Sequence, residues 1–135
     1  MTTKLTSRLH VRSYEIDSFG HVNNAVFLNY LEFARSDYLR QKGMSFSDFH
    51  NWRSYPFVVD IHIKYKNPAL FGDELEIIGW ISKASRTSFT LSHEIYNAAT
   101  GRLLIQADVT LVFVDENQRP TAIPEIFREK FEIER

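Results

Sequence analysis

Residues 14–24 read YEIDSFGHVNN and lie between a strand-like run and the one long helical pattern of the chain. Within eight residues, this stretch carries the carboxylate of Asp17, the glycine Gly20, the imidazole of His21 and the amides of Asn23 and Asn24. An Asn side chain accepts hydrogen bonds from the free N–H groups of a helix start, so Asn23 or Asn24 is predicted to cap a helix. We therefore expect a polar loop that leads directly into a helix N-terminus.

After the loop, apolar residues recur at spacings of three and four, which predicts an amphipathic helix over four turns. The apolar side of this helix consists of Phe27, Tyr30, Leu31, Ala34, Tyr38 and Leu39. Glu32 and Arg35 fall largely outside it. Lys42 and Gly43 predict the helix end, because a cation suits the last turn and glycine adopts a left-handed conformation readily.

The rest of the chain alternates with the period of two that is typical of strands. Strands are predicted over 5–14, 59–65, 75–81, 89–96 and 103–114, with an irregular segment at 44–55 that Ser45 and Asp48 could cap as a short turn. A short terminal helix is predicted over 124–131. The last four strands are joined by short links, which favours an antiparallel meander. One helix packed on one curled sheet gives an α+β fold, and residues 1–135 are predicted to form a single domain.

Composition excludes several classes of function. The chain has 135 residues, 44% of them hydrophobic, a net charge of −1 and no cysteine. A nucleic-acid partner is not expected at this charge, and disulfides, thiolate metal sites and a cysteine nucleophile are excluded. The five histidines lack the spacing of a metal site. No apolar run is long enough to span a membrane, and the N-terminus does not resemble a signal peptide. A soluble cytoplasmic protein is expected.

Asp17 has two interpretations. A loop aspartate most often forms a turn or a cap. Alternatively, Asp17 is a general base for water or a nucleophile toward a carbonyl. Gly20 favours the second interpretation, because it lets the backbone approach a ligand closely beside the helix start. Free N–H groups at 23–25 would stabilise developing negative charge, and a carboxylate beside an oxyanion site is a minimal arrangement for acyl transfer to water.

Other polar residues are weaker candidates. His21 is either a surface or capping histidine or a group that orients water or the substrate carbonyl. Glu32 is expected to be solvated or paired with Arg35 or Ser36. Arg86, with its neighbour Lys83, could meet phosphates or lie on a solvated turn. His93 falls in an alternating strand, where a satisfied or solvent-facing histidine is expected.

The loop resembles the 4-hydroxybenzoyl-CoA thioesterase family of hotdog-fold proteins. The family pattern is approximately D-x-x-G-H-V-x-N-x-x-Y/F followed by a helix with Glu and Arg, and residues 17–27 with Glu32 and Arg35 match it. Residues 65–73, which read YKNPALFGD, also fit the family. The string His-Val-Asn-Asn is similar to plant acyl-ACP thioesterases as well.

The resemblance implies a hotdog fold, in which a five-stranded antiparallel sheet wraps a long helix. It implies hydrolysis of acyl-CoA or acyl-ACP without a cofactor or metal, in a homodimer or homotetramer whose active site lies at the dimer interface. The residue matching the catalytic carboxylate is Asp17, and the backbone N–H at Asn24 matches an oxyanion donor. His21 is expected to assist catalysis. Substrate contacts are expected from Gly20, Asn23, Tyr30, Glu32 and Arg86.

Two other functions remain open at this point. Related hotdog proteins hydrate enoyl thioesters, but they use a D-x-N-x-x-H arrangement that this chain lacks. A binding protein that kept the fold and lost turnover is the third possibility. The presence of Asp17, Gly20 and His21 favours the hydrolase.

Overall fold

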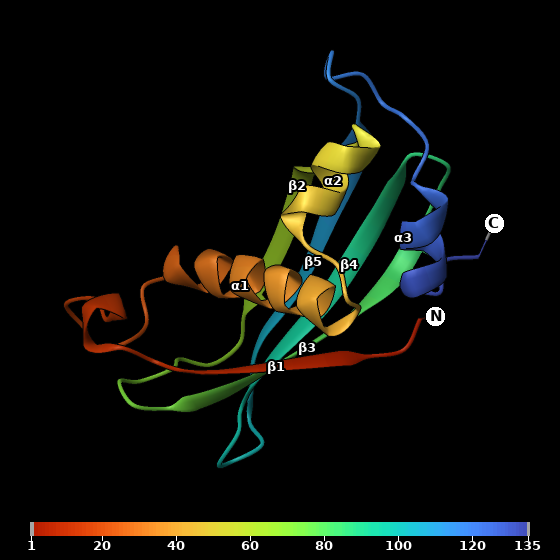
Figure 1. The fold of residues 1–135 in the computed structure, drawn as a ribbon. Coiled ribbons are helices and arrows are strands. Elements are labelled where there is room, and N and C mark those ends of the chain that lie inside the picture. Colours follow the sequence, from red (N-terminus) through yellow and green to blue (C-terminus); the bar gives the residue numbers. More distant parts are fainter. Residues whose placement is uncertain (1, 135) are drawn as a thin grey trace.

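The structure is a computed structural model and describes residues 2–134. In these residues a single antiparallel sheet curls around helix α1, and two shorter helices cover one end of the sheet (Figure 1). The strands are β1 (Leu5–His10), β2 (Tyr55–Tyr65), β3 (Glu74–Ala84), β4 (Ser88–Asn97) and β5 (Leu103–Val114). The helices are α1 (Val26–Gln41), α2 (Phe46–Trp52) and α3 (Glu125–Lys130), with a 3₁₀ turn at Ser13–Glu15. The predicted α+β hotdog fold is confirmed.

The strand order is β1-β3-β4-β5-β2. The predicted meander is correct for β3, β4 and β5, but it is wrong for β2, which pairs with β5 and not with β3. The link between β2 and β3 therefore crosses the sheet, from the edge strand β2 to the strand that lies next to the opposite edge. Periodicity alone cannot reveal this crossing, because it reports the faces of a strand and not its neighbours.

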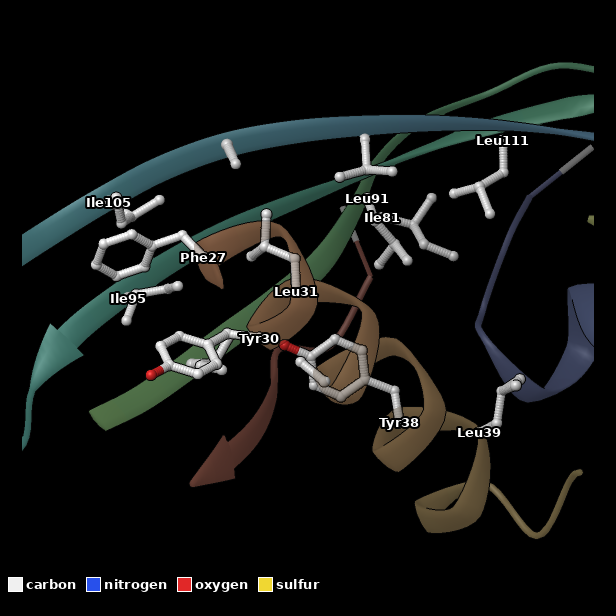
Figure 2. Close-up of a cluster of buried hydrophobic side chains, with 14 of the residues drawn as sticks. Phe27, Tyr30, Leu31, Tyr38, Leu39, Ile81, Leu91, Ile95, Ile105 and Leu111 are labelled. Carbon is white, nitrogen blue, oxygen red and sulfur yellow. The ribbon is translucent and has the colours of Figure 1, made fainter. Parts of the chain in front are cut away.

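Helix α1 supplies the centre of the core. The six residues of its predicted apolar side are all buried, as expected: Phe27, Tyr30, Leu31, Ala34, Tyr38 and Leu39. Figure 2 labels five of them, all but Ala34, on the side of the helix that faces the sheet. Ile95 and Ile105 lie near the first half of the helix, and Ile81, Leu91 and Leu111 lie near its second half. The helix ends as predicted, since Gly43 has a φ of +74°.

A glycine in β3 allows α1 to approach the sheet closely. A Cβ atom added at Gly79 would lie 2.6 Å from the ring of Tyr38. Tyr38 in turn stacks on His93, with ring centroids 5.9 Å apart. His93 is 1% exposed and therefore does not face solvent. Its hydrogen bonding is satisfied only in part, because Nδ1 lies 3.5 Å from the Tyr38 hydroxyl while Nε2 has no partner in the described chain.

The first strand is shorter than predicted. It ends at His10, and residues 13–15 form the 3₁₀ turn instead of continuing to Tyr14. The Arg12 N–H donates to the Glu15 carboxylate (2.8 Å), which closes the turn. Because β1 ends at His10, residues 14–24 do not belong to this strand and form a separate loop.

The segment predicted as irregular contains helix α2. Ser45 precedes this helix and Asp48 accepts a hydrogen bond from the Ser45 N–H at 2.8 Å, so both residues cap it. Phe49 of α2 and Phe127 of α3 meet in an aromatic cluster with Phe89 and Phe113. The two short helices thus close one end of the space between α1 and the sheet.

Strand β2 forms an open edge of the sheet. It was predicted to be half-buried, but of its four predicted apolar positions only Ile63 is partly covered. The exposed apolar side chains of the strand are Phe57, Val58, Val59, Ile61 and Tyr65. The opposite edge is partly covered, because the Gln41 side chain of α1 donates to the carbonyl of Thr6 (2.8 Å).

Candidate active site

The loop between β1 and α1 is a compact turn. Ile16 and Val22 pair as an isolated antiparallel bridge, and the Asp17 N–H donates to the His21 carbonyl at 2.7 Å. The Gly20 N–H returns to the Asp17 carbonyl (3.1 Å), and Gly20 has a φ of +83°, which favours glycine. Asp17 and His21 are therefore held side by side directly before the helix start.

The Asp17 carboxylate shapes this turn. Its Oδ1 accepts the N–H groups of Phe19 (2.9 Å) and His21 (3.2 Å), which is the turn-forming role expected of a loop aspartate. No hydrogen bond reaches Oδ2 within residues 2–134. One oxygen thus fixes the turn while the other remains available to water or substrate.

The same turn occurs a second time in the chain. Oδ1 of Asp115 accepts the N–H groups of Asn117 (2.8 Å) and Arg119 (3.1 Å), and Gln118 has a φ of 62°. This second turn connects β5 to the C-terminal segment. The geometry of the turn is therefore not a sign of chemistry by itself, and what distinguishes Asp17 is the helix start that follows.

The start of α1 is capped by Asn23, one of the two predicted residues. Helix α1 begins at Val26, and Ala25 before it already has helical dihedral angles (φ −71°, ψ −29°) and provides no side-chain cap. Asn23 acts two residues earlier, since its Oδ1 accepts the Ala25 N–H at 2.9 Å. The Asn23 N–H donates to the Glu15 carbonyl (3.0 Å).

Of the three N–H groups predicted to be free, those of Asn23 and Ala25 are thus occupied. The Asn24 N–H has no acceptor in the described part of the chain. It lies directly before Ala25, at the start of the turn that leads into α1. Of the three predicted N–H groups, only that of Asn24 therefore stays a candidate for the oxyanion donor.

Arg12 and Glu15 lie beside the predicted site residues, but the sequence did not single them out. Glu15 is 7% exposed, and its carboxylate accepts hydrogen bonds from Arg12 and from the hydroxyl of Tyr30 (2.8 Å). Burial, followed by the bond to Glu15, raises the pKa of Tyr30. The three-residue spacing of Arg12 and Glu15 is that of a capping box, but the box begins with Ser or Thr and so gave no signal here.

The remaining predicted site residues are spread over the chain. Tyr30 is 2% exposed and meets Glu15, while the side chain of His21 is exposed. Glu32 is exposed on α1 and forms no hydrogen bond or ion pair within the described residues. Arg86 follows β3 at the end opposite to His10 and the loop, so one chain does not bring it close to Asp17.

Glu32 and Arg35 line a cavity of about 160 Å³ between α1, the sheet and the two short helices. Its walls are mostly apolar and include Phe46, Leu91 and Val58. Burial lowers the pKa of Arg35, whereas the charge of Glu32 acts in the opposite direction. No loop residue lines this cavity, so in one chain the cavity and Asp17 are separate.

The end of β2 is tied to the helix start. The Tyr65 hydroxyl donates to the carbonyl of Asn24 at 2.9 Å, and the Val22 N–H donates to the Ala69 carbonyl at 2.9 Å. Within residues 2–134 no cluster of three metal-ligating side chains occurs, and none of the helices has the length and apolar content needed to cross a bilayer.

Comparison with known proteins agrees with this architecture. Residues 11–131 match the thioesterase-like superfamily. The chain is 33% identical over 133 residues to the long-chain acyl-CoA thioesterase FadM of Escherichia coli K12, covering 95% of this chain and 97% of that protein. It is 30% identical over 123 residues to the chloroplastic acyl-acyl carrier protein thioesterase ATL3 of Arabidopsis thaliana, covering 91% of this chain and 65% of that protein.

The fold itself is shared with the crystal structure of Slr0204, a 1,4-dihydroxy-2-naphthoyl-CoA thioesterase from Synechocystis. The two structures superimpose with a TM-score of 0.90 at 22% identity, covering 97% of each chain. The family match includes the loop of Asp17, the whole of α1 and all strands after it. The chain therefore belongs to the thioesterase-like superfamily of hotdog-fold proteins.

Proposed function

We propose that this protein hydrolyses acyl thioesters of CoA or acyl carrier protein to a free acid and a thiol. The observation that carries the proposal is the free N–H of Asn24 at the end of the turn that holds the Asp17 carboxylate. A thioester carbonyl gains negative charge when a nucleophile adds to it, and a preorganised donor lowers the energy of that state. The unoccupied Oδ2 of Asp17 supplies the base or nucleophile.

Two routes fit these residues. In the first, Asp17 removes a proton from a water molecule that attacks the thioester carbonyl. In the second, Asp17 attacks the carbonyl, releases the thiolate and forms an anhydride that water then cleaves. His21 has an exposed ring beside Asp17 and would orient the water in either route. When water cleaves the anhydride at the Asp17 carbonyl, ¹⁸O from labelled water enters Asp17 during a single turnover, and such label identifies the second route.

We infer that two copies of the chain pair through their β2 edges. An exposed edge of eleven residues with five exposed apolar side chains is a pairing surface that a monomer would leave to aggregation. Light scattering at micromolar concentration should give at least twice the chain mass of 15.8 kDa. A clean monomer would contradict the pairing.

Antiparallel pairing of two β2 strands would complete the site. Val58, near the start of β2, lines the cavity, whereas Tyr65 at its end bonds to Asn24. In an antiparallel pair the start of one strand lies opposite the end of the other. The cavity of one copy would then face the Asp17 loop of its partner and receive the apolar acyl chain.

Subunit mixing tests this composite site. The variant Asp17→Asn lacks the carboxylate, and Leu91→Trp fills the cavity. Each variant alone should be inactive, but a mixed dimer combines an intact loop from one copy with an intact cavity from the other. Recovery of activity on mixing supports the composite site. Absence of recovery, when mixed dimers are shown to form, places cavity and carboxylate in the same chain.

The activity is tested by thiol release from short, medium, long and aromatic acyl-CoA substrates, and from the same acyl groups on acyl carrier protein. Chromatography of the products separates a free acid from a hydrated thioester, and therefore separates a hydrolase from a hydratase. Binding of acyl thioesters without turnover would indicate a carrier. The cytoplasmic location stays a prediction, to be tested by fractionation of the source cells.

A further inference from the structure

Glu15 is a buried carboxylate that the reaction above does not use. It lies two residues before Asp17 and is 7% exposed. A charged side chain is rarely buried to this extent unless it is paired, because loss of hydration is costly. Its carboxylate accepts three hydrogen bonds and is therefore not available as a base. Its burial must have another explanation.

The bonds of Glu15 join three parts of the site. Oε1 accepts the Arg12 N–H (2.8 Å) and the Tyr30 hydroxyl (2.8 Å), and Oε2 accepts Nη1 of Arg12 at 3.1 Å. The backbone carbonyl of the same residue accepts the Asn23 N–H (3.0 Å). Glu15 thus ties together the turn before Asp17, the body of α1 and the segment that leads to Asn24.

The hydrogen bond from Tyr30 differs from the others because it connects Glu15 to helix α1. Within residues 2–134 it is the hydrogen bond by which a side chain of α1 holds the loop. Tyr30 lies in the core, packed edge-on against Phe27 with ring centroids 5.7 Å apart, so its hydroxyl is a rigid anchor. The hydroxyl donates to Glu15, because burial and the carboxylate both disfavour the phenolate.

We propose that Glu15 is a positioning residue, whose buried carboxylate holds the Asp17 turn at a fixed place relative to the Asn24 N–H. This inference rests on the proposed hydrolysis, since it concerns the geometry of the same site. Base and oxyanion donor lie on the two limbs of the loop, and Glu15 touches both limbs and the helix. Misplacement by about 1 Å costs on the order of 100-fold in rate, so a device of this kind affects turnover more than binding.

The test uses Tyr30→Phe, which removes one hydroxyl and keeps the packed ring, and Glu15→Leu, which removes all side-chain acceptors. We expect kcat for acyl-CoA hydrolysis to fall about 10- to 100-fold in both, with KM largely unchanged. Glu15→Gln keeps an acceptor for Tyr30 and should retain more of kcat than Glu15→Leu. Should Glu15→Leu fail to fold, Tyr30→Phe and Glu15→Gln still decide.

Two controls separate positioning from general loss of stability. Ala34→Gly weakens α1 at a buried site away from the loop, by about 1 kcal/mol, and should leave kcat near the wild-type value. In an Asp17→Asn background, Tyr30→Phe should cause little further loss, because positioning matters only while the carboxylate is present. Amide hydrogen exchange at residues 17–24 should accelerate in Tyr30→Phe and not in Ala34→Gly.

The outcomes are distinguishable from failure of the proposed function. A wild-type protein that releases no thiol from any acyl thioester overturns the hydrolysis, and the positioning role with it. An active wild type whose Tyr30→Phe and Glu15→Leu variants keep kcat within about twofold overturns the positioning role alone. So does a full, additive loss in the Asp17→Asn background, since the two residues would then act independently.

Discussion

In the proposed reaction, the Asp17 carboxylate has both a structural and a chemical task. Asparagine at this position keeps an Oδ1 that accepts the Phe19 and His21 N–H groups and replaces only the free oxygen. We therefore predict that Asp17→Asn stays folded and loses roughly 10²- to 10⁴-fold in kcat, as expected for loss of a base. Steady-state kinetics with the best acyl-CoA substrate measures this loss.

Asp115→Asn is the matched control for this prediction, because Asp115 forms the same turn far along the chain. It should retain full activity and a similar melting temperature. Near-normal kcat in Asp17→Asn would mean that the carboxylate serves the turn alone.

Gly20 and Asn24 have different roles in the proposed site. Gly20→Ala introduces a Cβ at a φ of +83°, which strains the turn although no atom lies within 4 Å. Asn24→Ala removes an amide side chain and leaves the backbone N–H in place. We predict that Gly20→Ala lowers kcat/KM far more than Asn24→Ala, while both variants fold.

Gly43→Ala controls for the strain of a positive φ, since Gly43 has a φ of +74° at the far end of α1. It should cost similar stability without loss of kcat/KM. The opposite order of the two loop variants would show that the Asn24 side chain binds substrate or water directly.

At this scale the sequence predicts Asp17, Gly20 and Asn24 as site residues because each has a local property: charge, freedom of φ, or closeness to a helix start. Glu15 was missed because its burial depends on Tyr30, which lies fifteen residues away in the chain. Isolated acidic residues carry no periodic signal, so only the packed structure reveals that this one is enclosed.

Among the elements, α1 depends on its close approach to β3. Gly79→Ala would place a Cβ 2.6 Å from the Tyr38 ring, which must then shift together with the helix. Overpacking of this kind costs about 1–3 kcal/mol, and we predict a loss of unfolding free energy in that range. Urea denaturation compares this variant with Lys83→Ala, an exposed change on the same strand. A loss equal to that of the control would contradict the close contact.

Elements with strong local patterns were predicted well. The buried side of α1 and the bounds of β5 follow from periods of 3.6 and two, which depend on neighbours within the same segment. The early end of β1 was not predicted, and α2 was predicted only as a short turn capped by Ser45 and Asp48. Both are decided by caps, the carboxylates of Glu15 and Asp48, whose effect depends on one bond each.

For the whole molecule, the buried His93 makes stability depend on pH. Burial, followed by the charge of Arg35, lowers the pKa of His93 from 6.5 to about 3. The His93 imidazole therefore binds a proton near pH 6.5 in the unfolded chain, but only near pH 3 in the folded chain. Stability is at its full value above that window and falls as the pH drops, by up to about 1.4 kcal/mol per pH unit.

Melting curves between pH 8 and pH 4 should show this fall, and His93→Gln should flatten it. The control is His50→Gln, because His50 is exposed on α2. An unchanged slope in His93→Gln would assign the acid sensitivity to other groups.

The strand order is where sequence reasoning failed at the scale of the molecule. Nothing within residues 59–65 records that β2 leaves its sequence neighbour and joins β5. Exposure of the β2 edge likewise depends on which strand lies beside it, and this outcome of the tertiary fold is also what makes an edge available for a second copy.

The bond from the Tyr65 hydroxyl to the Asn24 carbonyl connects that edge to the helix start. If copies associate through β2, the geometry of the Asp17 loop depends on protein concentration, because dissociation of the copies frees the strand whose Tyr65 holds the helix start. Turnover per mole of chain should therefore fall on dilution, with a lag on reconcentration set by reassembly. Tyr65→Phe should shift the concentration at which half of the turnover is lost, whereas catalysis by separate chains would be independent of dilution.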